Sequence, residues 1–106
     1  MKMYILIKDC VPYDKAIVVA AHASLAMYLQ YQGSDNVKKW LSGPFKKVVC
    51  KVSDSEFERA KKEMHCVVLQ ESSLDGIDVA LAFEPRDEWP KMFQYLKLYK
   101  VEEQKV

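Results

Sequence analysis

The first strand restricts the possible folds of this chain more than any other feature. Residues 3–7 are all hydrophobic and lack the polar alternation of a strand that has one face in water. A run of this kind is typical of a strand whose sheet is covered on both faces. We therefore expect a layered fold with this strand inside it.

A helix is predicted directly after this strand. Residues 9–14 include Pro12 and are typical of a turn, whereas residues 15–31 are rich in alanine and contain no proline or glycine. Gly33 marks the end of the helix. Because residues 15–31 are apolar nearly all round the helix, we expect the helix to be buried, with its alanines close to the sheet.

The rest of the chain alternates between helix and strand patterns. We predict a short helix at 35–41 and a strand at 46–52. Ser53 and Glu56 form a capping box for a helix that extends to about residue 64. Strands follow at 66–69 and 77–83, and their short connection favours antiparallel pairing. A last helix is expected over residues 87–98, with Asp87 as its cap and Pro90 in its first turn.

Four strands interleaved with four helices predict an α/β fold, a three-layer α/β/α sandwich around a mixed four-stranded sheet. The 106 residues are enough for one core and too few for two independent ones, so we expect a single domain over residues 1–106. The polar tail, residues 101–106, is expected to fray.

The cysteines and the apolar stretches indicate the cellular compartment of the protein. Cys10, Cys50 and Cys66 are widely spaced, which fits neither a disulfide framework nor a zinc site, so we expect reduced thiols. Cys50 and Cys66 lie in apolar strand-like runs, where we expect them to pack in the fold. The longest apolar stretches are far shorter than the roughly 20 residues that span a bilayer, and the first residues do not resemble a signal peptide. The sequence favours a cytoplasmic protein that does not contact membranes.

Charge is segregated along the chain although the formal net charge is only +1. Residues 71–88 contain six acids against one arginine, whereas residues 38–51 contain no acid and five lysines, namely Lys38, Lys39, Lys46, Lys47 and Lys51. Such a basic segment attracts a polyanion, because lysine contacts to phosphates gain from counterion release. The alternative is that these lysines only solvate the surface.

Lys15 and His22 are the residues of the first helix that point to chemistry. They are seven residues apart, so they project from the same side of the helix two turns apart. A helix start with free backbone N–H groups is an anion site, and the ammonium group of Lys15 would strengthen it. The residues alone leave open an alternative, in which Lys15 is solvated and His22 is a core histidine bonded to a backbone carbonyl.

A longer pattern surrounds this pair. Asp14 and Lys15 open the helix, and Ala21, His22 and Ala23 follow with the spacing of seven. The pattern resembles the type II peptidyl-tRNA hydrolases, whose first helix carries a lysine and a histidine with this spacing. The resemblance covers nearly the whole chain and continues through Lys47, Val48 and Val49, the helix start from Ser53 to Glu56, Leu69, Gln70 and Glu71, and Leu96, Lys97, Leu98 and Tyr99.

The resemblance implies that the protein hydrolyses the ester bond between a peptide and its tRNA. It also implies a homodimer, the family's four-stranded sheet between helices, and no metal or organic cofactor. Lys15 corresponds to the family's catalytic lysine, His22 to its histidine and Glu71 to the aspartate after its glutamine. We hypothesise that Glu71 takes a proton from the attacking water, that Lys15 stabilises the oxyanion or holds the terminal phosphate, and that His22 supports them.

The sequence departs from the family pattern at three places. Asp14 stands where the family has a glycine, and Val19 stands where it has a glutamine. The loop after Glu71 lacks the family's two threonines, and Ser72 or Ser73 is the candidate for a substitute hydroxyl. This loop is closer to a divergent branch, the peptidyl-tRNA hydrolase domain-containing proteins.

Three kinds of function follow. A hydrolase would bind the RNA through Lys15 and through phosphate contacts of Lys38, Lys39, Lys46 and Lys47. The alternative is a non-catalytic module that binds RNA or a small anion on the same scaffold. An interaction protein built on exposed Trp40 or Trp89 is the weakest hypothesis, because single aromatic residues in amphipathic helices usually belong to the core.

Overall fold

The structure, a computed structural model, describes residues 1–100. The predicted frayed tail, 101–106, lies outside the described residues. Helices and strands alternate along the chain in the order β1 (Lys2–Lys8), α1 (Tyr13–Tyr31), α2 (Asp35–Ser42), β2 (Lys46–Val52), α3 (Asp54–Lys61), β3 (Cys66–Gln70), the 3₁₀ turn η1 (Ser72–Leu74), β4 (Asp78–Phe83), the 3₁₀ turn η2 (Lys91–Tyr95) and β5 (Lys97–Leu98).

The strands form one mixed sheet in the order β3-β4-β1-β2-β5. β1 pairs in parallel with β2, while β4 lies antiparallel between β1 and β3. The antiparallel pairing predicted for the two strands after residue 65 is therefore confirmed. The predicted mixed sheet is also confirmed, but it has five strands and not four.

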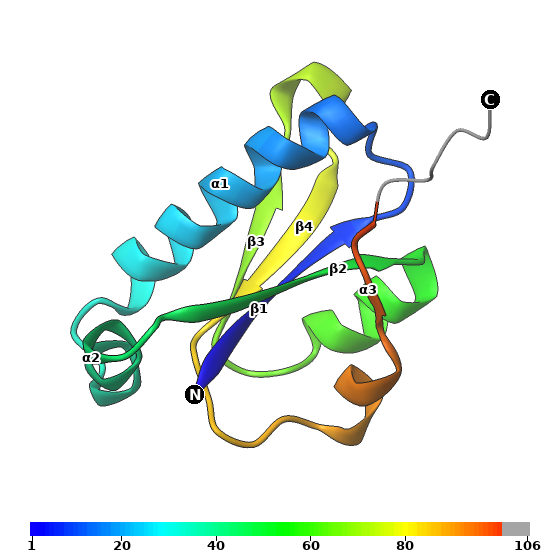
Figure 1. Ribbon diagram of the computed structural model, residues 1–106. Helices are drawn as coiled ribbons and strands as arrows, with labels where there is room; N and C mark the ends of the chain where they lie inside the picture. The colour runs from blue at the N-terminus through cyan, green and yellow to red at the C-terminus, as the bar shows by residue number, and fades with distance from the viewer. Residues whose placement is uncertain (101–106) are drawn as a thin grey trace, which may run out of the picture.

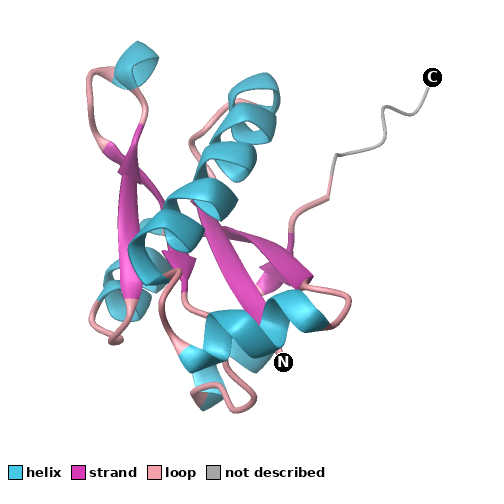
Figure 2. Ribbon diagram, turned by 90° about the vertical axis from the view of Figure 1, so that its left-hand side faces the viewer, coloured by secondary structure: helices cyan, strands magenta, loops and turns pink. Residues whose placement is uncertain are grey.

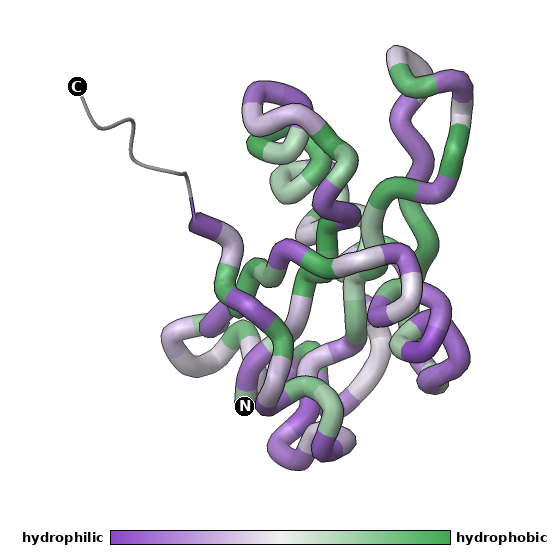
Figure 3. Tube along the Cα trace, turned by 90° about the vertical axis from the view of Figure 1, so that its right-hand side faces the viewer, coloured by the Kyte–Doolittle hydropathy of each residue, from purple (hydrophilic) through white to green (hydrophobic). Residues whose placement is uncertain are grey.

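Helices cover both faces of this sheet (Figures 1 and 2). Side chains of α1 and α2 form a core with one face of β1 and β4. Side chains of α3 and η2 form a second core with the opposite face. β1 is buried from Met3 to Ile7, as its sequence predicted, and Figure 3 shows apolar residues gathered on the central strands.

The predicted last helix, residues 87–98, is wrong. Pro90 has an extended backbone with a ψ of 148° and precedes only the short 3₁₀ turn η2. Lys97 and Leu98 then pair with β2 as the fifth strand, so their backbone groups complete the edge of β2. Asp87 does not cap a helix but pairs with the N-terminal ammonium at 3.4 Å.

The prediction that α1 is buried all round is also wrong. Only Ala16, Val19, Ala23 and Met27 face the sheet and are buried. The remaining sides of α1 carry large apolar side chains that stay largely exposed within the described residues, among them Ile17, Val18, Leu25 and Leu29. An apolar sequence alone could not distinguish a helix that is buried on all sides from one with an exposed apolar side.

The two tryptophans and Cys50 hold structural positions. Trp40 is 4% exposed and donates its indole N–H to the carbonyl of Lys46 at 2.8 Å. Trp89 packs among Tyr4, Phe83 and Phe93, so neither tryptophan offers the exposed surface of an interaction protein. Cys50 is buried, and burial raises the pKa of its thiol to about 11.

The predicted capping box at the start of α3 is confirmed and offers a test of local stability. Glu56 N–H donates to Ser53 Oγ at 3.2 Å, and Ser53 N–H donates to Glu56 Oε1 at 2.9 Å. Ser53→Ala removes one of these bonds, and we expect it to lower the free energy of unfolding by about 1 kcal/mol. Urea unfolding of the two proteins measures the difference. An unchanged midpoint would contradict the cap's contribution.

Candidate functional site

One edge of the sheet gathers the ends of strands that are far apart in the sequence. β1 and β3 both lie antiparallel to β4, so they run in the same direction and their carboxyl ends meet at the same edge. The first turn of α1, with Lys15, follows β1, and Glu71 follows β3 directly. Figure 1 shows η1, the turn after Glu71, at the same end of the molecule as the start of α1.

The start of α1 has no side-chain cap. Pro12 precedes the helix, and no side chain accepts a hydrogen bond from the N–H groups of the first turn. These groups carry the positive end of the helix dipole, which favours an anion at this position. Lys15 is half-buried in this turn and its ammonium group adds to the positive end of the helix, whereas the carboxylate of Asp14, the residue before it, is exposed and offsets part of this charge.

Glu71 begins a tight loop that fixes its carboxylate. Glu71 Oε1 accepts a hydrogen bond from the N–H of Ser73 at 3.3 Å and from Ser73 Oγ at 3.1 Å. Asp75 and Gly76 both have left-handed backbones, with φ of 58° and 68°, which aspartate and glycine tolerate and which reverse the chain toward β4. Both hydrogen bonds end on Oε1, so Oε2 is available to a water molecule or a substrate.

Electrostatics link Glu71 to the pair on α1. The two hydrogen bonds from Ser73 hold the pKa of Glu71 below its usual range, and the charges of Lys15 and His22 lower it further. Within residues 1–100, Lys15 and Glu71 form no direct ion pair. The ammonium group therefore acts on the carboxylate through its charge and not through a direct ion pair.

His22 lies on the same side of α1 as Lys15, as the spacing of seven predicted. Its side chain is exposed, so the alternative of a core histidine bonded to a carbonyl is wrong. Its charge acts on Glu71 together with that of Lys15. The site thus combines two basic groups from one helix with a carboxylate from the loop after β3.

A comparison with models of protein families shows which family has a similar sequence. The family model described as peptidyl-tRNA hydrolase PTH2 matches residues 1–99. The chain belongs to this family. A search among curated proteins finds no match. The PTH2 family is a family of hydrolases, and the mixed sheet between helices agrees with membership.

Two departures from the PTH2 pattern have structural counterparts. Val19 is 2% exposed and packs in the core beneath α1, so it offers no polar group to the site. Ser73 places a hydroxyl on the carboxylate of Glu71. Sequence reasoning named Ser72 and Ser73 equally, and only the loop geometry selects Ser73. The signal was the spacing of two between an acid and a serine, which is typical of a side-chain turn.

Four lysines of the basic segment, Lys38, Lys39, Lys46 and Lys47, do not adjoin this site. Lys46 pairs with Lys2 at the amino ends of β1 and β2, whereas Lys15 follows the carboxyl end of β1. A seven-residue strand separates the two ends by on the order of 20 Å. Lys38 and Lys39 are exposed on α2, which follows the far end of α1. Lys47 lies over the rings of Trp40 and Phe45.

Residues 1–100 contain no group of three or more histidine, cysteine or acidic side chains arranged to hold a metal ion. Among the helices of these residues, none has the length and hydrophobicity needed to cross a bilayer.

Proposed function

We propose that this protein hydrolyses the ester bond between tRNA and a peptide or an N-blocked amino acid. The observation that carries the proposal is the grouping of Lys15 and His22 with the ionised carboxylate of Glu71 at the uncapped start of α1. Membership in the PTH2 family supports it, because the family acts on peptidyl-tRNA. We expect the protein to act in the cytoplasm, where translation supplies this substrate.

In the proposed mechanism, water attacks the ester carbonyl while Glu71 Oε2 accepts its proton. The tetrahedral intermediate then breaks the bond to the ribose oxygen of the tRNA, which takes the proton and leaves as a hydroxyl. Ser73 holds the other carboxylate oxygen, so the free oxygen keeps a fixed direction. The low pKa of Glu71 keeps the carboxylate ionised at neutral pH, but it also makes Glu71 a weak base. Glu71 therefore orients the water as much as it activates it.

Lys15 supplies the positive charge in this mechanism. Attack of water on the carbonyl carbon places negative charge on the carbonyl oxygen, and a preorganised cation stabilises it more than the neutral ester. The free N–H groups at the start of α1 add hydrogen-bond donors on the same side. His22, two turns further along α1, supports the field at Glu71.

The experiment that tests the proposal is hydrolysis of a blocked substrate. Purified protein is incubated with an N-acetylaminoacyl-tRNA and with the same aminoacyl-tRNA without the block, and the uncharged tRNA is measured. The proposal predicts release from the blocked substrate. Release from neither substrate would refute it.

Two observations favour a second function. Glu71 caps η1 through Ser73, which is a structural role that needs no chemistry, and Val19 leaves the site without an amide. A non-catalytic module that binds RNA or a small anion would keep the positive site and lose turnover. Binding of tRNA without hydrolysis would favour this module.

Binding of tRNA by the basic segment should depend strongly on salt. Lys38, Lys39, Lys46 and Lys47 are exposed, so we propose them as phosphate contacts. Four such contacts predict that affinity falls about 100-fold between about 50 and 200 mM salt. The Lys38→Ala and Lys46→Ala double variant should lower the slope of log affinity against log salt by about two. Filter binding measures both, and a slope near zero would exclude a phosphate-based interface.

A homodimer is also part of the proposal, and the exposed side of α1 supports it. Leu25 and Leu29 are 57% and 58% exposed, and Leu25 borders an open apolar hollow with Leu41 and Phe45. Apolar surface of this kind favours association. Leu25→Lys should convert the dimer to a monomer in sedimentation experiments. Ser55→Lys should not, because it changes an exposed position on α3. A monomeric wild-type protein would contradict the dimer.

A further inference from the structure

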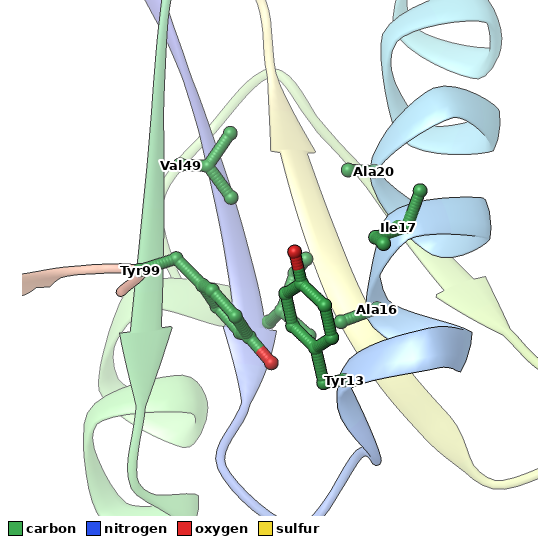
Figure 4. A pocket seen from close by; sticks show the side chains of 7 residues that line it. Tyr13, Ala16, Ile17, Ala20, Val49 and Tyr99 are labelled. Carbon is green, nitrogen blue, oxygen red and sulfur yellow. The ribbon is translucent and has the colours of Figure 1, made fainter. Parts of the chain in front are cut away.

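A second surface lies beside the start of α1, on the flank away from Glu71. An open apolar pocket of about 240 Å³ separates α1 from the β2 side of the sheet, with walls formed by Ile17, Ala20 and Val49 (Figure 4). Tyr13 and Tyr99 also line this pocket, and their rings stack with centroids 6.4 Å apart. None of these residues takes part in the proposed chemistry.

The two tyrosines form an accessible aromatic platform. Tyr13 lies in the first turn of α1 and is 50% exposed. Tyr99 is held against β2, because its N–H donates to the carbonyl of Val49 at 2.8 Å. Large aromatic rings that remain in contact with water offer a flat apolar surface to a planar ligand, and nucleic-acid bases stack on such rings regardless of sequence.

A basic hollow adjoins this pocket. It has a volume of about 500 Å³ and is lined by Lys51, Lys97, Leu98 and Lys100. The ammonium group of Lys51 lies 5.0 Å from the centroid of the Tyr99 ring, so it connects the hollow to the aromatic pocket. We refer to Tyr13, Tyr99, Lys51, Lys97 and Lys100 as the aromatic–lysine surface.

The lysines of this surface are arranged at an electrostatic cost. Lys51 of β2 and Lys97 of β5 are directly opposite each other in the register of the two strands. Like charges at opposed positions of antiparallel strands destabilise the pair. Among residues 1–100, those that line the hollow include no acid to offset this repulsion. A bound phosphate would remove the cost, which favours an anionic ligand over a purely apolar one.

The position of this surface relates it to the catalytic group. Tyr13 precedes Lys15 by two residues in the first turn of α1. Tyr13, Ile17 and Ala20 line the pocket on the β2 side, whereas the charges of Lys15 and His22 act on Glu71 beyond β3. A ligand on the aromatic–lysine surface therefore adjoins the first turn of α1, whose other flank carries Lys15.

We propose that the aromatic–lysine surface binds the unpaired end of the RNA that carries the ester. A base stacks on Tyr13 and Tyr99, and neighbouring phosphates pair with Lys51, Lys97 and Lys100. Aromatic platforms combined with a positive groove are typical of sites for single-stranded nucleic acid. The inference rests on the proposed function, because it takes that RNA to be the substrate.

Binding of short RNA tests this inference without any turnover. The probes are a fluorescent single-stranded RNA of about 8 nucleotides and a blunt duplex of the same sequence, measured by anisotropy. We expect the single strand to bind more tightly. Tyr99→Leu and Tyr13→Ala should each weaken its binding about 5- to 100-fold, while Tyr99→Phe keeps it. Tyr95→Leu, at an exposed tyrosine outside the surface, is the matched control.

Several outcomes would overturn the inference. Equal affinity of wild type, Tyr99→Leu and Tyr13→Ala for the single strand would do so, as would preference for the duplex. If Tyr13→Ala affected hydrolysis only of substrates with an apolar amino acid, the pocket would bind the peptide and not the RNA. This result would also overturn the inference. Hydrolysis with an unchanged KM in Tyr13→Ala refutes this inference alone. Loss of RNA binding in Tyr13→Ala, with no hydrolysis by wild type, refutes the proposed hydrolase and supports the RNA surface.

Discussion

Lys15→Ala is expected to lower kcat for N-acetylaminoacyl-tRNA about 10²- to 10³-fold. The ammonium group is the only side-chain cation in the first turn of α1, and removal of one preorganised group that stabilises an oxyanion has an effect of this size. The fold should tolerate the change, because alanine is the best helix former and Lys15 is only half-buried. Steady-state release of tRNA measures kcat, and thermal unfolding checks the fold.

The matched control is Lys62→Ala. Lys62 is exposed at the end of α3, on the other face of the sheet. Its substitution by alanine removes the same charge from the molecule as Lys15→Ala does. We expect wild-type kcat for this variant. Hydrolysis at the wild-type rate by Lys15→Ala would remove Lys15 from the mechanism, and an equal loss in Lys62→Ala would indicate a general charge effect.

A general base contributes about 10²- to 10⁴-fold to the rate of a reaction. We expect Glu71→Gln to reduce kcat by an amount near the lower end of this range, because the low pKa of Glu71 makes it a weak base. The amide keeps the shape of the side chain but cannot accept a proton. In wild type, kcat should fall in acid only as the pH passes below the lowered pKa of Glu71. A pH profile of kcat measures both effects, and the acid limb should disappear in Glu71→Gln.

Ser73→Ala provides the accompanying control. It deletes the hydroxyl that donates to Glu71 Oε1 at 3.1 Å and leaves the backbone N–H in place. The carboxylate loses part of its stabilisation, so the pKa of Glu71 rises and the acid limb of the profile moves to higher pH. An acid limb that stays in place in both variants would show that another group controls the rate.

Local patterns predicted much of the fold, because the decisive interactions lie within a few residues. The apolar β1, the strand at 46–52 and the box of Ser53 and Glu56 were all recognisable on these grounds. The strand near the end of the described residues was not recognisable from local patterns. Lys97 and Leu98 become a strand only by pairing with Cys50 and Lys51, which are far away in sequence. Propensity for helix at 87–98 could not outweigh that pairing.

The candidate site was predictable only in part. Helical spacing related Lys15 to His22, and the family resemblance added Glu71, whose charge contacts with both now link two distant segments. The hydrogen bond from Ser73 to Glu71 could be recognised only from the geometry of the loop after β3. The Tyr13 and Tyr99 pocket was outside the reach of sequence reasoning, since it joins the first turn of α1 to a residue 86 positions later.

The hydrolysis of an N-acetylaminoacyl-tRNA in water enriched in heavy oxygen tests the central claim most directly. Wild-type protein should release the acetylated amino acid with one heavy oxygen in its carboxylate, because water attacks the ester carbonyl, and Lys15→Ala should release almost none. Absence of release by wild type, or heavy oxygen in the tRNA and not in the released acid, would contradict the account.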